Sequence, residues 1–266
     1  MTAFTKHPED VIYGVKDGVA TIRINRPQAR NSLRYGTAAA IYDAALEASK
    51  DPSVRVVVLR GEGADFCAGA DIKQYNSEAS DQPQHLAQDR TYFHLPVLLH
   101  EMAPVTIAAV RGACAGAGFG WALGCDLRFA DTRAAFNTAF LAVGAAGDMA
   151  GPWTLSRIVG AGRARDLYFF PRKFGAQEAL DMGMVTRVFD EAAFETELDK
   201  LTTQLANSAP LALKALKANF LDAERMDMRA FSLAETERHA QIFPTRDRAE
   251  AFAAFAEKRP AKFEGR

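Results

Sequence analysis

Two segments of small residues follow apolar stretches of the chain, where backbone amides could do chemistry. They are 61–73, GEGADFCAGADIK, and 111–120, RGACAGAGFG. A small-residue turn that opens a helix leaves unpaired N–H groups at the positive end of the helix dipole, where they can bind an anion or an oxyanion. Each segment alone is also compatible with tight packing. The second fits no nucleotide motif, because Trp121 stands where the last glycine of Gly-x-Gly-x-x-Gly would be.

Asp148 is one of four aspartates, with Asp126, Asp131 and Asp166, that are the acidic residues between Glu101 and Glu178. It lies in the stretch AAGDMAGPW at 145–153, and no glutamate occurs between Glu101 and Glu178. In an apolar pocket walled by Phe140, Met149 and Trp153, its carboxylate would have a raised pKa suited to proton transfer. The alternative is that Asp148 caps the helix running on to residue 159.

The elements that must position these residues alternate between strands and helices. The turn at 17–18 and the period-two pattern over 19–25 predict a half-buried strand paired with 11–13, followed by a helix over about 32–50. Apolar runs predict further strands at 54–59, 105–110, 127–130 and 185–189. Strands separated by helices favour an α/β fold with a largely parallel sheet.

The last sixty or so residues contain no strand signal and predict helices over 211–221, 228–241 and 246–257. We expect a core over 1–205 that carries the site and a helical C-terminal region over 206–266. Apolar helix faces in such an appendage must be buried against the core or a second subunit, so oligomerisation is expected.

The composition of the chain excludes several classes of protein. Its 266 residues are 48% hydrophobic and 24% charged, enough for one large soluble core. A net charge of -1 provides no global basic field for nucleic acid or anionic membranes. The cysteines and histidines lack the spacing of metal ligands. Without a membrane-spanning run, or a signal or transit peptide over 1–10, we expect a cytoplasmic protein with no metal, nucleic-acid or membrane partner.

Together, and in this order, the two small-residue segments resemble the crotonase family, also called the enoyl-CoA hydratase/isomerase family. The resemblance covers nearly the whole chain. The matching stretches are 22–27, 66–73, 107–118, 124–127, 155–160 and 254–259. It implies a core of repeated ββα units, an acyl-CoA thioester substrate, and a C-terminal region that assembles a homotrimer or a dimer of trimers. Coenzyme A would be part of the substrate, so no separate cofactor is expected.

The resemblance also implies roles for particular residues. By motif position, the backbone N–H groups of Ala70 and Ala117 would hold the thioester oxygen as it becomes an enolate. Small side chains suit both positions, because the carbonyl must approach closely. The coenzyme A side of the same pocket would be lined by Ala68, Asp71 and Ile72.

The phosphates of coenzyme A need local cations, because the chain as a whole is nearly neutral. We expect Arg26 or Arg30 from the first loop to provide them, with Lys258 contributed by a neighbouring subunit.

The reaction within the family depends on which acidic residues are present. A typical hydratase has two glutamates, and the matching positions here are Gly120 and Phe140. Asp148 falls where members that shift a double bond carry a proton-shuttling aspartate. Aryl-CoA dehalogenases have a nucleophilic aspartate there and a histidine where this chain has Phe93, with His94 one residue away.

These positions favour isomerisation of an unsaturated acyl-CoA, with Asp148 taking and returning a proton. Hydration of an enoyl-CoA by Asp148 alone is the alternative within the enzyme class. A CoA-ester-binding protein without turnover is the alternative outside it.

Overall fold

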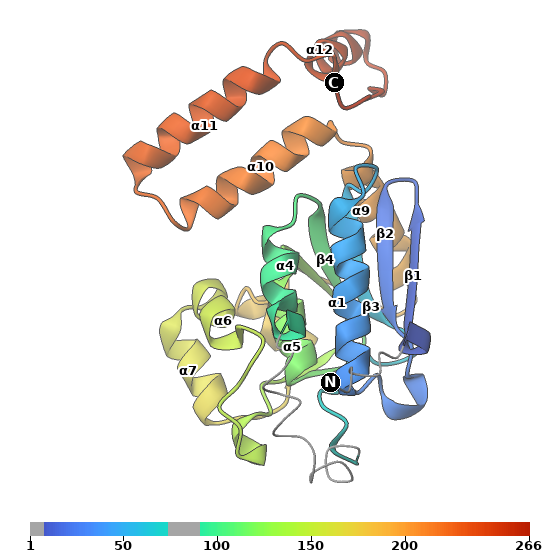
Figure 1. Cartoon of the computed structure of the whole chain (residues 1–266), viewed down its shortest axis with the longest axis vertical. Helices are drawn as coiled ribbons and strands as arrows, with labels where there is room; N and C mark the ends of the chain where they lie inside the picture. The colour runs from blue at the N-terminus through green and yellow to red at the C-terminus, as the bar shows by residue number, and fades with distance from the viewer. Residues whose placement is uncertain (1–7, 74–90) are drawn as a thin grey trace, which may run out of the picture.

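The computed structural model describes residues 8–73 and 91–266, and it shows an α/β fold built on one large sheet (Figure 1). In the order of the sheet, the six strands are β1 (Val11–Lys16), β2 (Val19–Ile24), β3 (Val56–Gly61), β4 (Val105–Val110), β6 (Leu127–Asp131) and β9 (Arg187–Phe189). Only β1 and β2 pair antiparallel, and every other neighbouring pair is parallel. The predicted fold class is confirmed, and each predicted strand region contains a strand.

A second sheet of three very short strands was not predicted from the sequence. It has the order β5 (Ala113–Ala115), β7 (Ala135–Asn137) and β8 (Phe174–Gly175). Strands of two or three residues are too short to show a period-two pattern, which is why the sequence gives no signal for them.

Helices cover both faces of the large sheet. On one face, α1 (Tyr35–Lys50), α4 (Leu95–Glu101) and α5 (Ala117–Gly124) pack over side chains such as Ile22 and Leu59. On the other face, α9 (Phe194–Ala206) covers a smaller apolar cluster. The remaining helices before the C-terminal region are α6 (Gly151–Val159), α7 (Ala161–Phe169) and α8 (Ala176–Asp181), with short 3-10 helices η1 (Pro8–Asp10), η2 (Pro27–Ala29), η3 (Thr91–His94) and η4 (Leu141–Val143).

The first long helix begins later than predicted. Helix α1 starts at Tyr35 rather than near Ser32. The residues before it pair with the first small-residue turn instead, because the Leu33 N–H donates to the Gly69 carbonyl at 2.8 Å and the Asp71 N–H donates to the Leu33 carbonyl at 3.0 Å. The local periodicity did not reveal this contact between distant segments.

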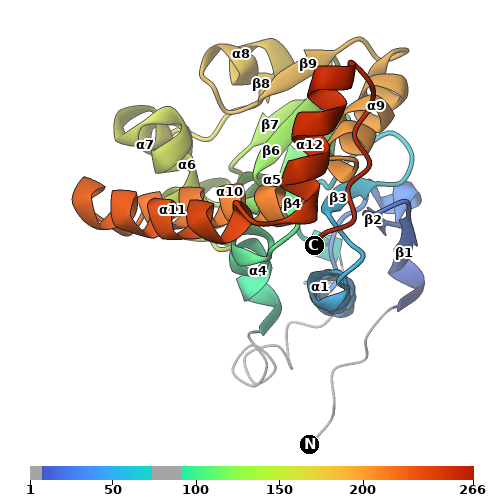
Figure 2. The same cartoon turned by 90° about the horizontal axis from the view of Figure 1, so that it is seen from above.

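The C-terminal region is helical, as predicted, and comprises α10 (Pro210–Ala223), α11 (Met228–Ile242) and α12 (Arg246–Glu257). Helices α10 and α11 form an antiparallel pair that stands apart from the core (Figures 1 and 2). Apolar side chains on these helices are exposed, including Phe220 at 68%, Leu233 at 70% and Phe255 at 86%. The boundary between 205 and 206 stays a prediction, although α9 does end at Ala206.

No described helix is both long enough and apolar enough to cross a membrane. Residues 1–7, on which the expectation of no leader partly rests, lie outside the described residues.

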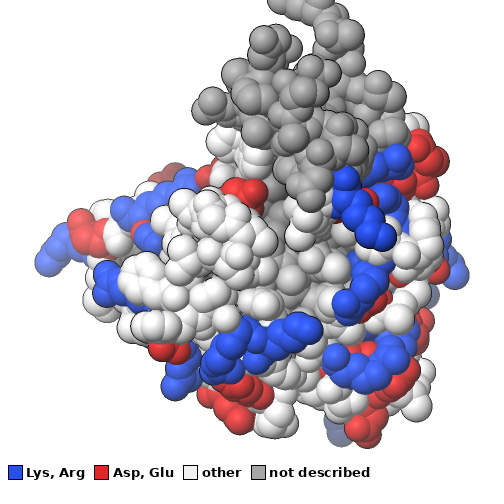
Figure 3. Space-filling view, turned by 90° about the horizontal axis from the view of Figure 1, so that it is seen from below, with Lys and Arg blue, Asp and Glu red and all other residues white. Residues whose placement is uncertain are grey.

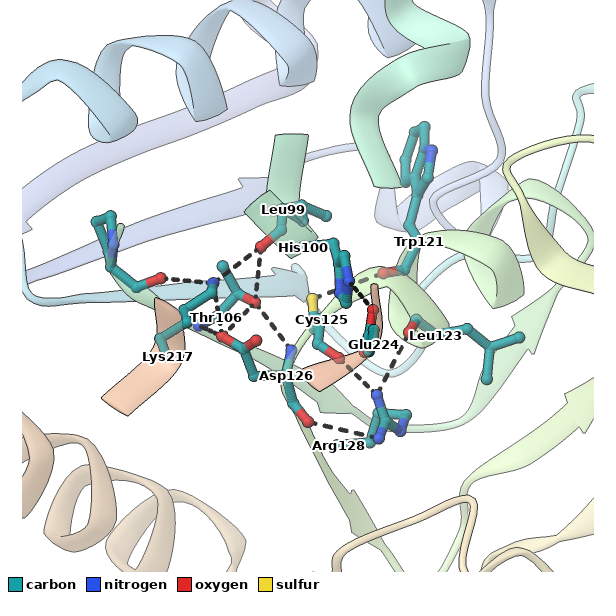
Figure 4. Close-up of polar contacts among 11 residues, drawn as sticks. Leu99, His100, Thr106, Trp121, Leu123, Cys125, Asp126, Arg128, Lys217 and Glu224 are labelled. Carbon is teal, nitrogen blue, oxygen red and sulfur yellow. Dashed lines mark hydrogen bonds and ion pairs between the residues drawn. The ribbon is translucent and has the colours of Figure 1, made fainter. Parts of the chain in front are cut away.

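A buried lysine attaches the C-terminal region to the core (Figure 4). The Lys217 ammonium of α10 lies 2.7 Å from the Asp126 carboxylate, and its side chain is only 5% exposed. The same ammonium donates to the carbonyls of Leu99 and Pro104 at 3.2 and 2.8 Å. Asp126 also accepts the Thr106 N–H at 2.7 Å, so one polar cluster joins α4, β4, β6 and α10.

We predict that Lys217→Met lowers the free energy of unfolding by about 3 kcal/mol, because removing one partner of a buried ion pair leaves the other charge uncompensated. Methionine keeps most of the aliphatic length, so the loss reports the charge. The matched control is Lys200→Met, whose side chain is 69% exposed on α9 and which should unfold like wild type. Urea denaturation measures both, and equal effects of the two variants would contradict the prediction.

Candidate active site

The structure brings the two small-residue turns side by side. Residues 65–70 run parallel to β5, and Cys67 pairs with Cys114 across the bridge. The Cys67 N–H donates to the Ala113 carbonyl at 2.9 Å, and the Ala115 N–H donates to the Cys67 carbonyl at 2.9 Å. Counting three residues on from this pair reaches Ala70 on one segment and Ala117 on the other. The pairing therefore places the two predicted amide donors at matching positions of adjacent segments.

A glycine precedes each predicted donor, and the two glycines let the backbones touch. Gly69 has a φ of +97° and Gly116 a φ of +54°, both in the left-handed region. A Cβ on Gly69 would lie 3.2 Å from the Ala115 carbonyl oxygen, and a Cβ on Gly116 would lie 3.6 Å from the Gly69 Cα. Side chains at either position would push the two turns apart.

The backbone amides of Ala70 and Ala117 have no backbone acceptor among the described residues. Ala117 is the first residue of α5, so its N–H has no carbonyl one turn earlier to bond. The bridge between Leu33 and Ala70 is formed by the Gly69 carbonyl and the Asp71 N–H, so the Ala70 N–H makes no hydrogen bond in it. Within 8–73 and 91–266, neither N–H donates to a backbone carbonyl. The start of α5 adds the positive end of its dipole to this place.

The loop that carries Asp148 packs directly against α5. Gly120 lies almost one turn after Ala117, and a Cβ there would stand 2.5 Å from the Cβ of Met149 and 3.0 Å from its carbonyl oxygen. The Trp121 indole N–H also reaches the Met149 sulfur at 3.3 Å. Met149, the residue after Asp148, therefore packs on α5 about one helical turn after Ala117. The position of the first hydratase glutamate, Gly120, is filled by the Asp148 loop itself.

The backbone of this loop adopts an unusual conformation. Met149 and Ala150, the two residues after Asp148, have φ values of 52° and 54°. Non-glycine residues in the left-handed region cost free energy and concentrate at functional sites. Ala150, not Asp148, is the N-cap of α6, and its own side chain makes no capping hydrogen bond. The Gly151 N–H bonds to the backbone carbonyl of Asp148, not to its carboxylate. The capping interpretation of Asp148 is thus wrong.

The Asp148 carboxylate lies in an apolar surrounding. Its Oδ1 is buried and has no hydrogen-bond partner among the described residues. Burial raises the pKa of Asp148 from 3.8 to about 6. The predicted rise of this pKa is confirmed, and its cause is desolvation of the charged form.

The predicted walls of this pocket are partly correct. Phe140 lies beside Gly147, and it lines a cavity of about 310 Å³ together with Pro152 and Tyr168. Trp153, next along α6, turns away and lines a separate cavity, where its ring contacts that of His100 at 5.7 Å. Successive residues of a helix point in directions about 100° apart, which explains why Pro152 and Trp153 face different spaces.

The two loop arginines have different surroundings. The Arg26 side chain is 11% exposed and donates to the Asp71 carboxylate at 2.9 Å, so it is engaged in the protein's own ion pair. Arg30 is 62% exposed and donates to both oxygens of Asp65 at 2.9 and 3.0 Å. Of the two, Arg30 presents the accessible cation.

The other predicted coenzyme A residues are divided between the turn and the far end of the chain. Ala68 is half-buried with its N–H bonded to the Arg30 carbonyl, and Ile72 is 58% exposed at the edge of the described turn. Lys258 follows α12, at the end of the molecule opposite α5 (Figure 1). A single chain therefore does not bring Lys258 to the amides of Ala70 and Ala117. On the face seen from below, Lys and Arg side chains lie to the right of and below an uncharged area (Figure 3).

Tyr168 is a polar group beside Asp148 that the sequence did not single out. Its ring lines the cavity with Phe140, and the Tyr168 hydroxyl is buried without a partner in the described part of the chain. Burial, and then the charge of Asp148, raise the pKa of Tyr168. Twenty residues separate it from Asp148, so no local spacing could have indicated the contact.

The cysteines take no part in this site. Cys67, Cys114 and Cys125 are free and buried, and burial raises the pKa of each thiol. Among the residues that the structure describes, no group of three or more His, Cys, Asp or Glu side chains could hold a metal ion.

The chain combines a parallel α/β core with two facing amide turns and one buried carboxylate. These features suit an enzyme that binds a thioester, and comparisons with known proteins agree. The family model described as enoyl-CoA hydratase/isomerase matches residues 14–266. A 4-chlorobenzoyl coenzyme A dehalogenase-2 of Arthrobacter sp is 37% identical over 76% of this chain and 74% of that protein. The 1,2-epoxyphenylacetyl-CoA isomerase of Escherichia coli (strain K12) is 29% identical over 97% of this chain and 99% of that protein.

A solved structure gives the same result for the fold. The crystal structure of an enoyl-CoA hydratase from Polaromonas sp. JS666 matches with a TM-score of 0.88 at 29% identity, covering 96% of this chain and 99% of that one. The chain belongs to the enoyl-CoA hydratase/isomerase family, whose members are acyl-CoA-processing enzymes.

We predict that the stability advantage of Asp148→Asn over wild type grows between pH 4 and pH 8. With a native pKa of about 6 against an ordinary 3.8, the folded protein binds this proton more tightly than the unfolded chain. The wild-type free energy of unfolding therefore falls as the pH rises from about 4 to about 6, whereas asparagine has no proton to lose. Urea denaturation at several pH values measures the difference. The control is Asp166→Asn at an exposed position of α7, and a pH-independent difference for Asp148→Asn would contradict the prediction.

Proposed function

We propose that this enzyme isomerises an unsaturated acyl-CoA, with Asp148 as the base and the amides of Ala70 and Ala117 as the oxyanion hole. The observation that carries the proposal is the packing of the Asp148 loop against α5 at Gly120, about one turn from the Ala117 amide. This contact supports a carboxylate and an oxyanion site that act on the same substrate. Among the described residues, the cause of the raised pKa of Asp148 is burial.

In this mechanism the thioester oxygen accepts hydrogen bonds from the two amides. The ionised Asp148 removes a proton from a carbon next to the double bond or the carbonyl, and the electrons move toward the thioester oxygen to form an enolate. The same carboxyl group returns the proton to a different carbon. The double bond shifts, and no atom is gained or lost overall. A carboxyl pKa of about 6 leaves the base ionised at neutral pH yet able to hold the proton briefly.

The cavity beside the Asp148 loop is suited to the acyl group. Its volume is about 310 Å³, and its walls are mostly apolar. Phe140, Pro152 and Tyr168 line it, with Ser156 and Arg165 as its polar members. We propose that the acyl chain extends from the oxyanion site past Asp148 into this space.

Hydration is less well supported than isomerisation. A glutamate at Gly120 would collide with Met149, and the second hydratase position is Phe140, an aromatic wall of the cavity. Water would have to be activated by Asp148 alone.

Dehalogenation is a second candidate because of the 37% identity to the Arthrobacter enzyme. Among the described residues, the position that would carry its histidine holds Phe93, which packs against the core, and His94 is exposed at the start of α4. A chlorinated aryl-CoA ester offered to the enzyme distinguishes it, because dehalogenation would release chloride.

For the coenzyme A part of the substrate, we propose Arg30 as the phosphate-binding cation of this chain. Arg26 would instead fix Asp71, through the ion pair at 2.9 Å, at the edge of the pocket beside Ala68 and Ile72. Lys258 remains a predicted contribution from a neighbouring subunit.

One assay with two variants tests the proposed chemistry. Wild type should convert straight-chain or aromatic-derived enoyl-CoAs to products of unchanged mass, whereas hydration adds the mass of water. We expect Asp148→Asn to lose about 10²- to 10⁴-fold in turnover, the usual value of a general base. Ala117→Val should lose about 10²- to 10³-fold by crowding one oxyanion donor.

Both variants should remain folded, which circular dichroism checks. Turnover of Asp148→Asn within a few-fold of wild type would remove Asp148 as the base. CoA-ester binding without turnover by the wild type would favour the binding-protein alternative.

We also propose that the exposed apolar side chains of α10, α11 and α12 are buried between copies of the chain, as a homotrimer or a dimer of trimers. Leu233→Asp, on the exposed face of α11, should shift the mass in sedimentation equilibrium to that of one chain, because a charge cannot be buried there without a partner. Val15→Asp on β1, another exposed apolar position, is the control and should leave the assembly intact. A wild-type protein that sediments as a monomer would contradict the proposal.

A further inference from the structure

The ring of Tyr168 lies along the loop that carries Asp148. A Cβ on Gly147 would stand 3.6 Å from the Tyr168 Cε1, and a Cβ on Gly151 would stand 1.9 Å from its hydroxyl oxygen. Gly147 and Gly151 are the residues on either side of the segment 148–150. The phenol therefore spans this segment from one side to the other, and its hydroxyl rests where a side chain of Gly151 would be.

Two buried polar atoms meet at this place without partners. They are the Asp148 Oδ1 and the Tyr168 hydroxyl, and neither has a hydrogen bond within the described ranges. Buried polar atoms in folded proteins are almost always paired. Each of these atoms supplies what the other lacks, because a phenol donates and a carboxylate only accepts. The raised pKa of Tyr168 keeps its hydroxyl protonated at neutral pH.

We propose that Tyr168 is a positioning residue for Asp148: its hydroxyl donates a hydrogen bond to Oδ1 and leaves Oδ2 to exchange the proton with the substrate. The inference rests on the proposed role of Asp148 as the base. A carboxylate held by one oxygen presents the other in a fixed direction.

The surrounding helices keep Tyr168 in place. The Thr138 hydroxyl donates to the Leu167 carbonyl at 2.8 Å, which ties α7 to the end of β7 one residue before Tyr168. The bare Cα of Gly151 at the start of α6 makes room for the hydroxyl. The tyrosine therefore has a fixed approach to the Asp148 loop.

Within the described part of the chain, the helices around Asp148 bring no charged side chain to its carboxylate. Helix α5 has the sequence AGFGWALG and therefore carries no titratable side chain. On α6, Arg157 stacks on Trp153, with its guanidinium 3.7 Å from the ring centroid. On α7, the charged residues Arg163, Arg165 and Asp166 are exposed.

The decisive experiment compares Tyr168→Phe with wild type across the pH profile of kcat/KM. Loss of a donor to the carboxylate raises the pKa of Asp148, so the acid limb should move up by about one pH unit. The rate should fall about tenfold on that limb and recover to within about twofold at high pH. Tyr13→Phe is the matched control, because the Tyr13 hydroxyl is also buried without a partner among described residues but lies on the edge strand β1.

A second variant keeps the hydroxyl and displaces it. The methyl group of Gly151→Ala would collide with the Tyr168 hydroxyl, so this variant should move the acid limb in the same direction as Tyr168→Phe. A loss of rate that is equal at all pH values, or an unshifted limb in both variants, would overturn the positioning role.

Titration of the Asp148 carboxyl carbon by NMR separates this inference from the proposed function. The signal is assigned by its absence in Asp148→Asn, and the measurement needs no turnover. A midpoint that rises in Tyr168→Phe supports the contact even if Asp148→Asn retains activity and the proposed function fails. An unshifted midpoint overturns the inference even if Asp148 proves to be the base.

Discussion

The contact between the Gly69 and Gly116 backbones is the constraint on which the site depends. The parallel bridge from Cys67 to Cys114 draws the two segments together, and the glycines let them touch where each chain turns. Both small-residue turns come from loops at the ends of neighbouring parallel strands, β3 and β4. The parallel arrangement of the sheet thus brings amides separated by 47 positions in the numbering, Ala70 and Ala117, to one place.

A second contact without a side chain brings the carboxylate to the same place. Gly120 allows the backbone of Met149 to lie against α5, and the strained residues Met149 and Ala150 turn the chain from the Asp148 loop into α6. The resulting burial leaves Asp148 poorly solvated, which raises its pKa. The lack of a side chain at Gly120 therefore lets the Asp148 loop lie against α5. The burial that results determines how Asp148 titrates. Met149 occupies the space that a hydratase glutamate at position 120 would need.

The C-terminal helices depend on a different kind of interaction. Lys217 is buried among carbonyls and the Asp126 carboxylate, so α10 is joined to the core by charge and hydrogen bonds rather than by a large apolar interface (Figure 4). The apolar side chains of α11 and α12 stay exposed. The polar attachment fixes α10 on the core, and the exposed apolar side chains are consistent with the proposed assembly of several copies.

The sequence by itself determined the α/β class, the positions of the main strands, the helical C-terminal region and the family, because these rest on periodicity and on contiguous motifs. It also indicated Asp148 as the one acidic candidate, since the other carboxylate positions are Gly120 and Phe140. The start of α1, the second sheet and the ion pair that occupies Arg26 depend on contacts between distant segments. That Asp148 is buried and does not cap α6, that Trp153 turns away and that Tyr168 approaches the loop were decided only by the tertiary structure. Their physical reason is shared: burial and hydrogen-bond partners are properties of space, and no spacing along the chain encodes them locally.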